Sequence, residues 1–593
     1  MSNNRYQGGN RGGNNRNNPP NPALARGVAA QPGRDNSQNQ EQNPLQAMNI
    51  AEFKIDEQGK EIASSVLTRA VEIEQKSCVQ LYTTLTQRTK SLAKNGETIS
   101  AKFSWRLRVG GVRGFREMLL PVFHPVYGIP YIPASSLKGA VRAWARQHHD
   151  VGEVDRLLGY INDKNKLSSS IGCVQFLDTF PTKPCLSIDI ANPQWHWQND
   201  FSIKYKPEPH AVLSTEKPEF LIGLTATSKG NINNVRAVKE WLEAALKEGI
   251  GSRVSAGYGS IAANVNNSNS QSCEFELWTQ GMYGASPPTR ENEYRGVAEF
   301  RPTAIRGILR YWFRTIALGL YSPSKCKELE DTLFGTIQSQ TKKSQVVRGT
   351  INIKVEITGE EEGNKNYPYF YAGKIVLESK TTKHLNLIKH LLQLSSHMGG
   401  IGRGSRRPLH WNNPQMRGCH WELTNCTNLV YSKKSWENFL KKLMELFEEI
   451  KPFDSPGSGN PGEPDNRLHD VLNHNSKIYL VRCSELQHPE SVDDWRQDGN
   501  QADVRGEALE VLYDKSNNFK GKNQSGQGNS KVGGKLETPS YVVIKSNFPS
   551  ERTPYQVVTI FGADDDERGK FARKFKEMLK SGDAIFINYP IAK

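Results

Sequence analysis

The chain has 593 residues, which is long for one domain and fits roughly three to five units of ordinary size. Hydrophobic residues make up 36% and charged residues 23% of it, so a wholly disordered chain is excluded. The mean hydropathy is −0.63, and there is no apolar run near the roughly 18 residues that span a bilayer. These features exclude an integral membrane protein, and without an apolar leader we expect no secretory signal.

The charge balance points to a polyanionic partner. The chain carries 77 lysines and arginines against 62 acidic residues, a formal net charge of +15. Such an excess favours nucleic acid or an anionic membrane surface, although a merely soluble basic protein is the alternative. The eight cysteines form no CxxC pair, a usage typical of a reducing compartment.

Residues 1–45 consist mainly of Asn, Gly, Arg, Pro and Gln. This composition has too few apolar residues to build a core, so we predict a disordered tail. Its scattered arginines, including Arg5 and Arg11, could contact RNA without sequence preference. A solubilising extension is the other interpretation.

Mixed helices and strands are predicted from there to about residue 270. Helical spacing covers 61–92, and alternation of apolar with basic residues over 101–109 predicts a half-buried strand with Arg106 and Arg108 on its solvent side. Further along we predict an extended run at 119–126, a helix from Ser135 or Ser136 to about 146 and a strand at 173–180. A second helix at 234–247, a glycine-rich loop at 249–260 and a linker at 265–273 follow.

The order of elements then restarts. A strand is predicted at 273–280, a helix after Pro302, a strand at 351–358, a helix at 384–394 and a Gly/Arg loop at 399–408. Beyond these we predict a helix at 436–449, a Pro/Gly loop at 452–464 and a Gly/Lys/Asn-rich insert at 515–535. A strand-rich end with one more helix follows at 541–590. Strands mixed with helices indicate an α+β or α/β protein rather than a helical bundle.

Two segments of the sequence share one frame. PASSLKGAVRAWAR (133–146) and RPTAIRGILRYWFR (301–314) both follow the pattern [LI]-[KR]-G-x-[VL]-R-x-W-x-R at a constant offset. Each is followed by a loop rich in Gly, Ser and Arg, at 249–261 and 399–411. Because two similar elements recur in the same order, we interpret the chain as a tandem duplication or fusion of one module.

The repeated helix and loop both have features of phosphate-binding elements. The cations of each helix stand four apart, which places them on one face, and Ser135, Ser136 and Gly139 lie where free backbone N–H groups favour an anion. The glycines of the loops allow close approach of backbone to a ligand, their arginines donate charge-assisted hydrogen bonds, and Tyr258 could stack on a base. The competing interpretation is a solvated basic face and a tight turn.

Catalytic and metal motifs are mostly missing. GNSKVGGKL (528–536) fails the Walker A spacing, and the spacings around His148-His149-Asp150, Cys173, and Cys419-His420 match no common metal site. His124 could act as a general acid or base, although a structural or RNA-contacting role is the simpler interpretation. Residues 101–149 contain a single carboxylate, Glu117, and a two-metal nuclease needs clustered carboxylates. We therefore predict no catalytic residue, metal or cofactor.

The repeat resembles the RAMP superfamily of CRISPR effector proteins. GIPYIPASSLKGAVR (128–142) is most similar to the sixth subunit of the type III-B (Cmr) complex. The segment 278–314 together with GGIGRGSRRP (399–408) looks like the first Cmr subunit. The resemblance implies a natural fusion of these two subunits, with α+β architecture: tandem ferredoxin-like (RRM-related) modules at 46–270 and 271–593 after the tail. It is weak over 46–100 and 411–593.

The resemblance also implies a role. The chain would be a non-catalytic, cytoplasmic, RNA-binding subunit of a prokaryotic antiviral complex that caps the 3′ end of the CRISPR RNA and contacts target RNA. Its partners would be both RNAs and the repeating backbone, small and large signature subunits, with no membrane. The family's target-cutting subunit carries an Asp in the loop before the helix, whereas residues 113–123 here contain only Glu117. This departure puts cleavage by this chain in doubt.

The predicted RNA-binding residues are the helix starts, the cations and the loop residues just described: Ser135, Ser136, Lys138, Gly139, Arg142, Arg146, Gly251, Arg253, Gly257, Tyr258, Gly259, Arg301, Arg306, Arg310, Arg314, Gly402, Arg403, Gly404, Arg406 and Arg407. A rival hypothesis is a metal-independent endoribonuclease that uses His124 as acid or base and Lys138 or Arg142 to stabilise the phosphorane. A further alternative is an RNA chaperone outside any CRISPR system, driven by the tail.

Overall fold

The computed structural model describes most of the chain after the tail. The described residues are 43–50, 54–55, 61–110, 119–162, 169–192, 195–198, 201, 203–205, 209–261, 269–287, 296–338, 345–412, 415–426, 428–454, 470–496, 502–514, 516, 518–520, 530–534, 540–550 and 552–589. The predicted tail falls almost wholly outside them, as does most of the 515–535 insert. Residues 42–593 form one compact unit.

The first part of this unit runs to residue 261. Its helices are α1 (Pro44–Ile50), α2 (Ala63–Ser77), α3 (Val79–Leu92), α4 (Ala134–His148), α5 (Val151–Leu158), α6 (Ile232–Glu248) and the short η3 (Val254–Ala256). Its strands are β1 (Lys54–Ile55), β2 (Glu61–Ile62), β3 (Glu97–Lys102), β4 (Arg106–Leu107), β5 (Val174–Phe176), β6 (Leu186–Ala191), β7 (Trp195–Trp197), β8 (Ile203–Tyr205), β9 (His210–Glu216) and β10 (Glu219–Ala226).

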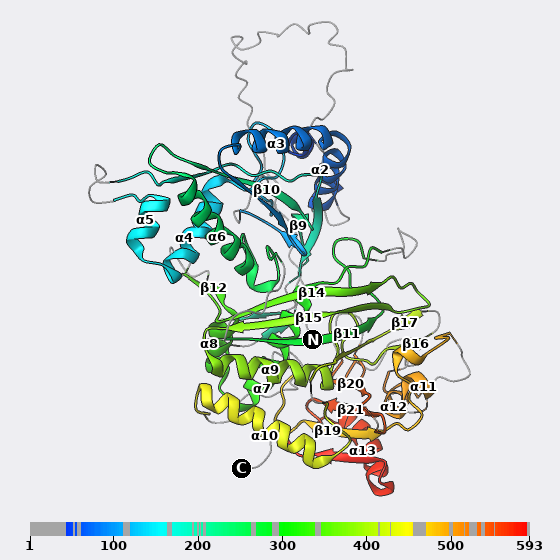
Figure 1. Cartoon of the computed structure of the whole chain (residues 1–593). Coiled ribbons are helices and arrows are strands. Elements are labelled where there is room, and N and C mark those ends of the chain that lie inside the picture. Colours follow the sequence, from blue (N-terminus) through cyan, green and yellow to red (C-terminus); the bar gives the residue numbers. More distant parts are fainter. Residues whose placement is uncertain are drawn as a thin grey trace, which may run out of the picture. The chain divides into compact units, whose positions relative to one another are not determined.

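The main sheet of this part has the ferredoxin-like order. Strands run β3-β10-β5, and Ile261 bridges to Phe103 just beyond β3, in the place of a fourth strand after α6. Ile222 and Leu224 of β10 belong to the core with α4 and α6. Gly223 between them faces the other way, toward Thr89 of α3, so helices cover both faces of this sheet (Figure 1).

The second part contains a complete ferredoxin-like unit. Its elements are β11 (Ser270–Thr279), α7 (Pro302–Leu320), α8 (Pro323–Phe334), β12 (Thr336–Gln338), β13 (Gln345–Val347), β14 (Ile351–Glu361), β15 (Tyr369–Ser379), α9 (Thr382–Met398), β16 (His410–Asn412), β17 (Gln415–Arg417), β18 (Cys419–Leu423) and α10 (Lys433–Ile450). The antiparallel order β14-β15-β11-β18 with α7 and α9 as crossovers is that of a βαββαβ fold.

A third sheet follows in the C-terminal region. Its elements are β19 (Lys477–Arg482), η4 (Pro489–Ser491), α11 (Ala502–Arg505), α12 (Glu507–Tyr513), β20 (Val542–Asn547), β21 (Tyr555–Ile560), α13 (Asp566–Ser581) and β22 (Ala584–Ile587). The order β20-β21-β19-β22 repeats the ferredoxin-like pattern. Helix α9 packs between this sheet and the second one, and a single apolar core runs through both. The region after α10, where the sequence resembles the family only weakly, therefore holds one more unit of the same topology.

Helix boundaries follow the local sequence closely. The helix predicted from Ser135 or Ser136 begins at Ala134, directly after Pro133. The helix predicted at 234–247 spans Ile232–Glu248 and begins with a reciprocal capping box between Asn231 and Asn234. The single helix predicted over 61–92 is wrong, because the chain breaks at Cys78 into α2 and α3. None of the described helices combines the length and the apolar character that a membrane crossing requires.

Candidate nucleic-acid interface

The basic face of α4 packs against the next helix. The Arg142 Nη2 atom donates to the carbonyl oxygens of Leu158 and Gly159, at 2.7 and 2.5 Å, where α5 ends. Arg146 forms an ion pair of 3.5 Å with Asp155 of α5. Arg142 and Arg146 therefore both contact α5, although the Arg146 side chain stays 51% exposed. Arg142 thus satisfies carbonyls that the helix end leaves unpaired.

The matching face of α7 is more deeply engaged. Arg306 donates to the carbonyl oxygen of Phe334 at the end of α8, and Arg310 forms an ion pair of 2.5 Å with the buried Glu330. Arg314 is fully buried, with its guanidinium 3.6 Å from the ring centroid of Trp195 on β7. The expectation of an outward-facing trio is therefore wrong for α7, since α8 and the β7–β8 hairpin cover it.

The sequence contains a signal for this arrangement that the repeat frame did not use. Helix α5 ends in Leu-Leu-Gly (157–159) and α8 ends in Leu-Phe-Gly (333–335). Gly159 and Gly335 have φ values of +72° and +75°, a conformation that favours glycine. A second glycine packs on each turn, Gly172 on the end of α5 and Gly349 on the end of α8. A Cβ built on either one would lie 2.5 or 2.6 Å from the backbone of that helix end. The repeat therefore includes a second helix whose end the arginines bind.

Tyr258 of the first glycine-rich loop points into the protein. Its ring is 1% exposed, and its hydroxyl donates to the buried carboxylate of Asp189. Arg301 donates to the same carboxylate at 2.6 Å and to the carbonyl of Ile190 at 3.0 Å. Burial and the Asp189 charge raise the pKa of Tyr258. The predicted stacking of Tyr258 on a base is wrong as geometry, because the ring is buried and its hydroxyl satisfies Asp189, the carboxylate that Arg301 also binds.

The same loop connects the two repeats. A Cβ on Gly257 would lie 2.6 Å from Pro302 at the start of α7, and Arg306 Nη1 donates to the carbonyl of Ser255 at 2.9 Å. Nearby, Arg106 of β4 forms an ion pair of 2.7 Å with Glu299. Residues 251–259 thus serve as part of an interface within the chain, a role that sequence reasoning did not assign to them.

The second glycine-rich loop is tied to the C-terminal sheet by two of its three arginines. Arg406 forms an ion pair of 2.5 Å with Asp470 and donates to the carbonyl of Ser540. Arg407 is buried and donates to the Val542 carbonyl and the Ser540 hydroxyl, at 2.6 and 2.7 Å. Arg403 alone of the three is exposed. The expectation that Arg406 and Arg407 extend toward a ligand is therefore wrong.

The loop glycines of the second module lie against the end of β11. A Cβ on Gly402 would be 3.0 Å from Met282, and one on Gly404 would be 2.4 Å from Gln280. Both glycines have positive φ, at +69° and +80°. The predicted need for glycine is confirmed by this close packing, but the neighbours are side chains of the protein.

A pocket does form where helix and loop converge in the first module. It has a volume of about 320 Å³ and is lined by Val109, Gly110, Ile132, Ser136, Ile250, Gly251 and Ser252. That size is within the range of small-ligand sites. Ser136 and Gly251, two predicted site residues from distant segments, are thus brought to one cavity. Gly110 and Gly251 have φ values of +94° and +86°, so backbone borders the cavity without side chains.

A buried cation lies behind this pocket. Arg108 is 5% exposed, and its Nε donates to the hydroxyl of the lining residue Ser252 at 3.0 Å. Its Nη1 reaches no acceptor among the described residues. Burial and then the neighbouring Arg253 lower the pKa of Arg108, against weaker opposing effects of Tyr258 and Asp189. Because no carboxylate among the described residues forms an ion pair with Arg108, its guanidinium gives the pocket positive potential.

Sequence reasoning placed Arg108 on the solvent side of a regular strand, and this was wrong. The chain leaves the sheet after β3, makes the short strand β4 with β9, and turns Arg106 and Arg108 inward. The glycine pair directly after Arg108 and Val109 was the available signal, because a cation beside unhindered backbone is typical of anion sites.

The remaining predicted residues of the first module surround the start of α4 and the loop. Ser135 and Gly139 are exposed, and no heavy atom lies within 4 Å of a Cβ built on Gly139. Lys138 is half-buried, and burial and then Arg142 lower its pKa. Arg253 lies 5.8 Å from the ring centroid of Tyr258. Ala134 at the helix start donates to Asp178 at 2.8 Å, so a carboxylate of the protein binds the first amide.

His124, the residue of the rival hypothesis, sits in an aromatic cluster. Its ring lies 4.6 Å from that of Tyr127 and 5.0 Å from that of Tyr131. The Nδ1 atom accepts the backbone N–H groups of Val126 and Tyr127, at 3.2 and 3.3 Å. Burial lowers the pKa of His124. The neutral ring therefore carries its proton on Nε2, so it has no free nitrogen lone pair to act as a base.

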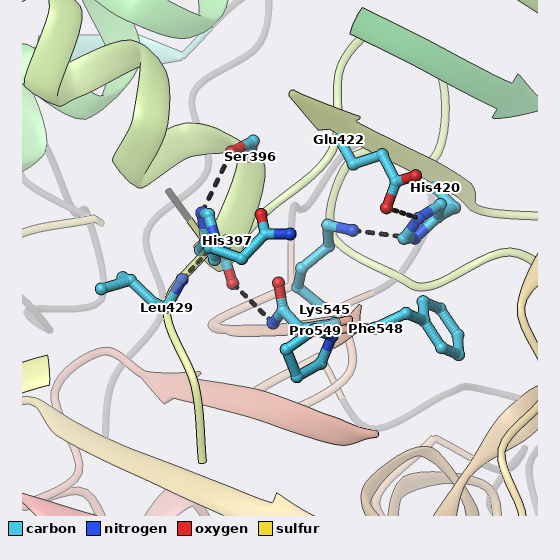
Figure 2. Close-up of a pocket in the computed structure, with 10 residues that line it drawn as sticks. Ser396, His397, His420, Glu422, Leu429, Lys545, Phe548 and Pro549 are labelled. Carbon is cyan, nitrogen blue, oxygen red and sulfur yellow. Dashed lines mark hydrogen bonds and ion pairs between the residues drawn. The ribbon is translucent and has the colours of Figure 1, made fainter. Parts of the chain in front are cut away.

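The C-terminal part contains a buried polar cluster around Lys545 (Figure 2). The Lys545 amine, 1% exposed, donates to His420 Nδ1 at 2.9 Å and to the Ser546 carbonyl at 2.8 Å. Burial lowers the pKa of Lys545 to about 7 and that of His420 to about 3. The space among the lining side chains is about 10 Å³, roughly that of one water.

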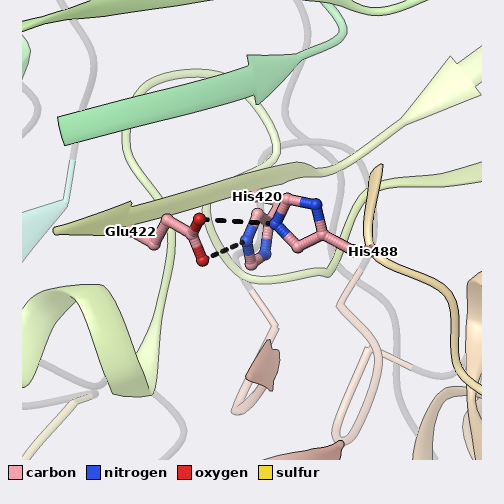
Figure 3. Close-up of side chains that lie close together, drawn as sticks. All are labelled: His420, Glu422 and His488. Carbon is pink, nitrogen blue, oxygen red and sulfur yellow. Dashed lines mark hydrogen bonds and ion pairs between the residues drawn. The ribbon is translucent and has the colours of Figure 1, made fainter. Parts of the chain in front are cut away.

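His420, Glu422 and His488 come as close together as metal ligands do (Figure 3). Both Nε2 atoms lie 3.3 Å from oxygens of Glu422. His488 Nδ1 already accepts the N–H of Glu490, as His420 Nδ1 accepts Lys545. Each neutral ring then has its proton on Nε2, directed at Glu422. Ligation would displace those protons, so the cluster fits a hydrogen-bonded network better than a metal site.

Comparison with known proteins agrees with this architecture. The model of the RAMP superfamily matches residues 105–262 and 282–407. These two segments contain the repeated helices α4 and α7 and both glycine-rich loops. These two segments of the chain are therefore similar to the RAMP superfamily, and the predicted tandem of ferredoxin-like modules is confirmed.

Individual relatives are more distant. Over 141 residues, 23% of this chain, it is 26% identical to the CRISPR system CMR subunit Cmr6 of Saccharolobus solfataricus, and the match spans 45% of that protein. The chain thus covers less than half the length of this curated relative. The recognised likeness to the sixth Cmr subunit is confirmed by this match.

Similar solved structures include Cmr1 from Pyrococcus furiosus in its apo form. The match is 15% identical, covers 53% of this chain and 98% of that chain, and has a TM-score of 0.30. Cmr6 from the same organism has 20% identity, 28% and 98% coverage, and a TM-score of 0.17. A chain of the type III-B Cmr-beta complex bound to cognate target RNA has 20% identity, 38% and 82% coverage, and a TM-score of 0.26. Because these TM-scores are low, the likeness to the RAMP superfamily rests on the family model alone.

Proposed function

We propose that the chain is an RNA-binding subunit of a type III-B CRISPR effector complex. The pocket between α4 and residues 249–260 carries this proposal, because the buried Arg108 donates to the lining residue Ser252 and forms no ion pair with a carboxylate among the described residues. A phosphate group bound there would supply the missing negative charge. The net charge of +15 favours the same class of ligand.

The finer roles follow from the similarity to Cmr subunits. The first module would bind the 3′ end of the CRISPR RNA, and the second would contact target RNA, in a chain that fuses two subunits. Backbone, small and large signature subunits would be the protein partners, in the cytoplasm. The exposed Ser135, Ser136 and Gly139 and the half-buried Lys138 would complete the RNA contact around the pocket.

Binding of labelled single-stranded RNA to the full chain tests the proposal. Replacing Arg108 with Gln should weaken RNA binding roughly tenfold or more, since a charged hydrogen-bonding group contributes about 1.5–3 kcal/mol. Arg573→Gln removes the same charge from an exposed position of α13 in the C-terminal unit and serves as the control. Melting temperatures would verify that both variants fold. Equal binding by wild type and Arg108→Gln would remove the basis of the proposal.

Salt dependence provides a second measurement on the wild type. If six to eight cations contact the strand, the logarithm of the binding constant should fall with the logarithm of salt at a slope of about −4 to −6. A slope near −1, which corresponds to one or two contacts, would contradict an extended RNA interface.

The rival function, a metal-independent ribonuclease, has weaker support. His124 Nδ1 is bound to backbone N–H groups, and Arg142 is bound to the end of α5. Incubation of the purified chain with labelled RNA in EDTA distinguishes the two functions. Cleavage that His124→Ala abolishes would establish the rival.

A further inference from the structure

A second group of cations gathers around Tyr513 in the C-terminal part. It combines Arg407 from the loop at 399–408, Arg417 at the end of β17, Arg505 at the end of α11, and Lys520 after α12. Three of these four, Arg417, Arg505 and Lys520, are half-buried rather than buried. Segments far apart in the sequence therefore bring four positive charges to one place.

Tyr513 lies at the centre of the group. Lys520 Nζ donates to the Tyr513 hydroxyl at 2.7 Å and lies 4.4 Å from the ring centroid. The guanidinium of Arg505 lies 5.5 Å from the same centroid. His410 Nε2 is 3.2 Å from the hydroxyl. Arg505 and Lys520 thus contact the Tyr513 ring through cation–π interactions.

The charges of the group are not balanced. Among the described residues, no carboxylate forms an ion pair with Arg407, Arg417, Arg505 or Lys520. The Nε atoms of Arg407 and Arg505 are buried and find no acceptor there. Burial and then Arg407 and Arg417 lower the pKa of Lys520 to about 7. Such like-charge crowding is unfavourable unless an anion offsets it.

The group is continuous with an exposed predicted site residue. A Cβ on Gly404, the chain neighbour of Arg403, would lie 2.7 Å from the Cα of Gly418, the chain neighbour of Arg417. In agreement with this proximity, burial and then Arg403 lower the pKa of Arg417. Arg403 is the exposed arginine of the loop at 399–408. In contrast, the arginines of α7 are engaged with α8 and β7.

We propose that Arg417, Arg505 and Lys520 around Tyr513, together with Arg403, form the phosphate-binding surface of the second module, and that the buried Arg407 adds positive potential behind them. This inference rests on the proposed function, because it takes the phosphates to belong to an RNA strand. It relocates the contact from the predicted α7 residues Arg306, Arg310 and Arg314 to a surface made by the loop, β17 and the C-terminal unit. Guanidinium and ammonium groups are the usual donors to phosphate oxygens.

The test compares the full chain with the double variant Arg417→Gln, Lys520→Gln. The control is Arg573→Gln, Lys576→Gln, which removes one Arg and one Lys from exposed positions of α13 in the same unit. With labelled single-stranded RNA, the first variant should bind roughly tenfold more weakly or worse. Its salt slope should be shallower by about 1.4, which corresponds to two lost phosphate contacts on a single strand. The control should bind like wild type.

Thermal melting separates a binding role from a structural one. Removing two mutually repelling charges should leave the melting temperature unchanged or raise it, whereas loss of a structural contact would lower it. Weakened RNA binding together with a lower melting temperature would overturn the inference. So would RNA binding equal to that of the control.

Two further outcomes keep this inference distinct from the proposed function. If Arg108→Gln weakens RNA binding but Arg417→Gln, Lys520→Gln does not, the proposed function stands and this surface is refuted. If wild type binds no RNA, both fail. Adenosine monophosphate serves as the probe for a free nucleotide: a melting shift in wild type that the double variant lacks, with equal RNA affinities, would assign the surface to nucleotides and overturn the RNA inference.

Discussion

The two repeated helices, α4 and α7, carry the same pattern of cations but have different surroundings. On α4, Lys138 and Arg146 keep contact with solvent, and a pocket opens beside Ser136. On α7, α8 and the β7–β8 hairpin cover the pattern, and Arg314 is fully buried. A charge pattern that predicts one face of a helix therefore does not determine whether that face meets solvent, because this depends on what packs against it.

The largest effect is expected where the repeats meet. Replacing Arg301 with Ala leaves the fully buried Asp189 without its guanidinium partner. Loss of one partner of a buried pair costs about 3–5 kcal/mol, since the other charge stays desolvated. Urea denaturation should show this decrease in the free energy of unfolding.

The first module provides the matched control. Arg146→Ala breaks an exposed pair with Asp155, in which the Arg146 side chain is 51% exposed. Such pairs contribute about 0–1 kcal/mol. Equal losses for Arg301→Ala and Arg146→Ala would show that burial does not distinguish the two regions.

The pH dependence of stability tests a buried charge in the C-terminal part, the ammonium group of Lys545. The folded pKa of Lys545 is about 7, below its usual 10.5, so the unfolded state binds one more proton between these values. The free energy of unfolding should rise with pH in that window, by up to about 1.4 kcal/mol per pH unit from this group. Urea titrations at pH 7, 8 and 9 would measure it.

Lys545→Met removes this contribution. Among the titratable neighbours of Lys545, His420, Glu422 and His397 have lowered pKa values that place their titration below the window, and burial raises the pKa of Cys419 to about 11, above it. The variant should therefore have a flatter profile than wild type over these three pH values. Parallel profiles would contradict the burial of an ammonium at this position.

The smallest effects are expected at the matched glycines of the two helices. A Cβ at Gly139 or Gly307 meets no heavy atom within 4 Å, so alanine should fit both sites. Each substitution should raise stability by roughly 0.5–1 kcal/mol, because glycine is unfavourable inside a helix. Only Gly139 is near the pocket residue Ser136, so only Gly139→Ala should reduce RNA affinity. Equal RNA affinities for both variants would separate the α4 start from the RNA contact.

Much of the fold could be predicted from local patterns. The helices α4, α6 and α10 begin within a few residues of their predicted positions, because capping residues and apolar periodicity act locally. The break at Cys78 was missed because helical spacing continues through it. The third ferredoxin-like sheet was missed as a separate unit because an insert and a Pro/Gly loop interrupt its pattern.

The candidate site was predictable only in part. Ser136 and Gly251 were both selected from the sequence, since helix starts and glycine loops are recognisable there, and the structure places them in one pocket. Arg108 was not, because alternation predicts the side of a strand only while the strand stays regular. The cations around Tyr513 come from four separate segments, and no local pattern connects them.

The amino-acid sequence by itself determined the repeat, the resemblance to the RAMP superfamily and the positions of most helices, since each depends on residues close together in the chain. Only the tertiary structure decided which cations are available. Arg306, Arg310, Arg314, Arg406 and Arg407 found partners within the protein, whereas in the described part of the chain no carboxylate pairs with Arg108 or Lys520. The physical reason is that charge pairing acts between groups that are near in space, whatever their separation along the chain.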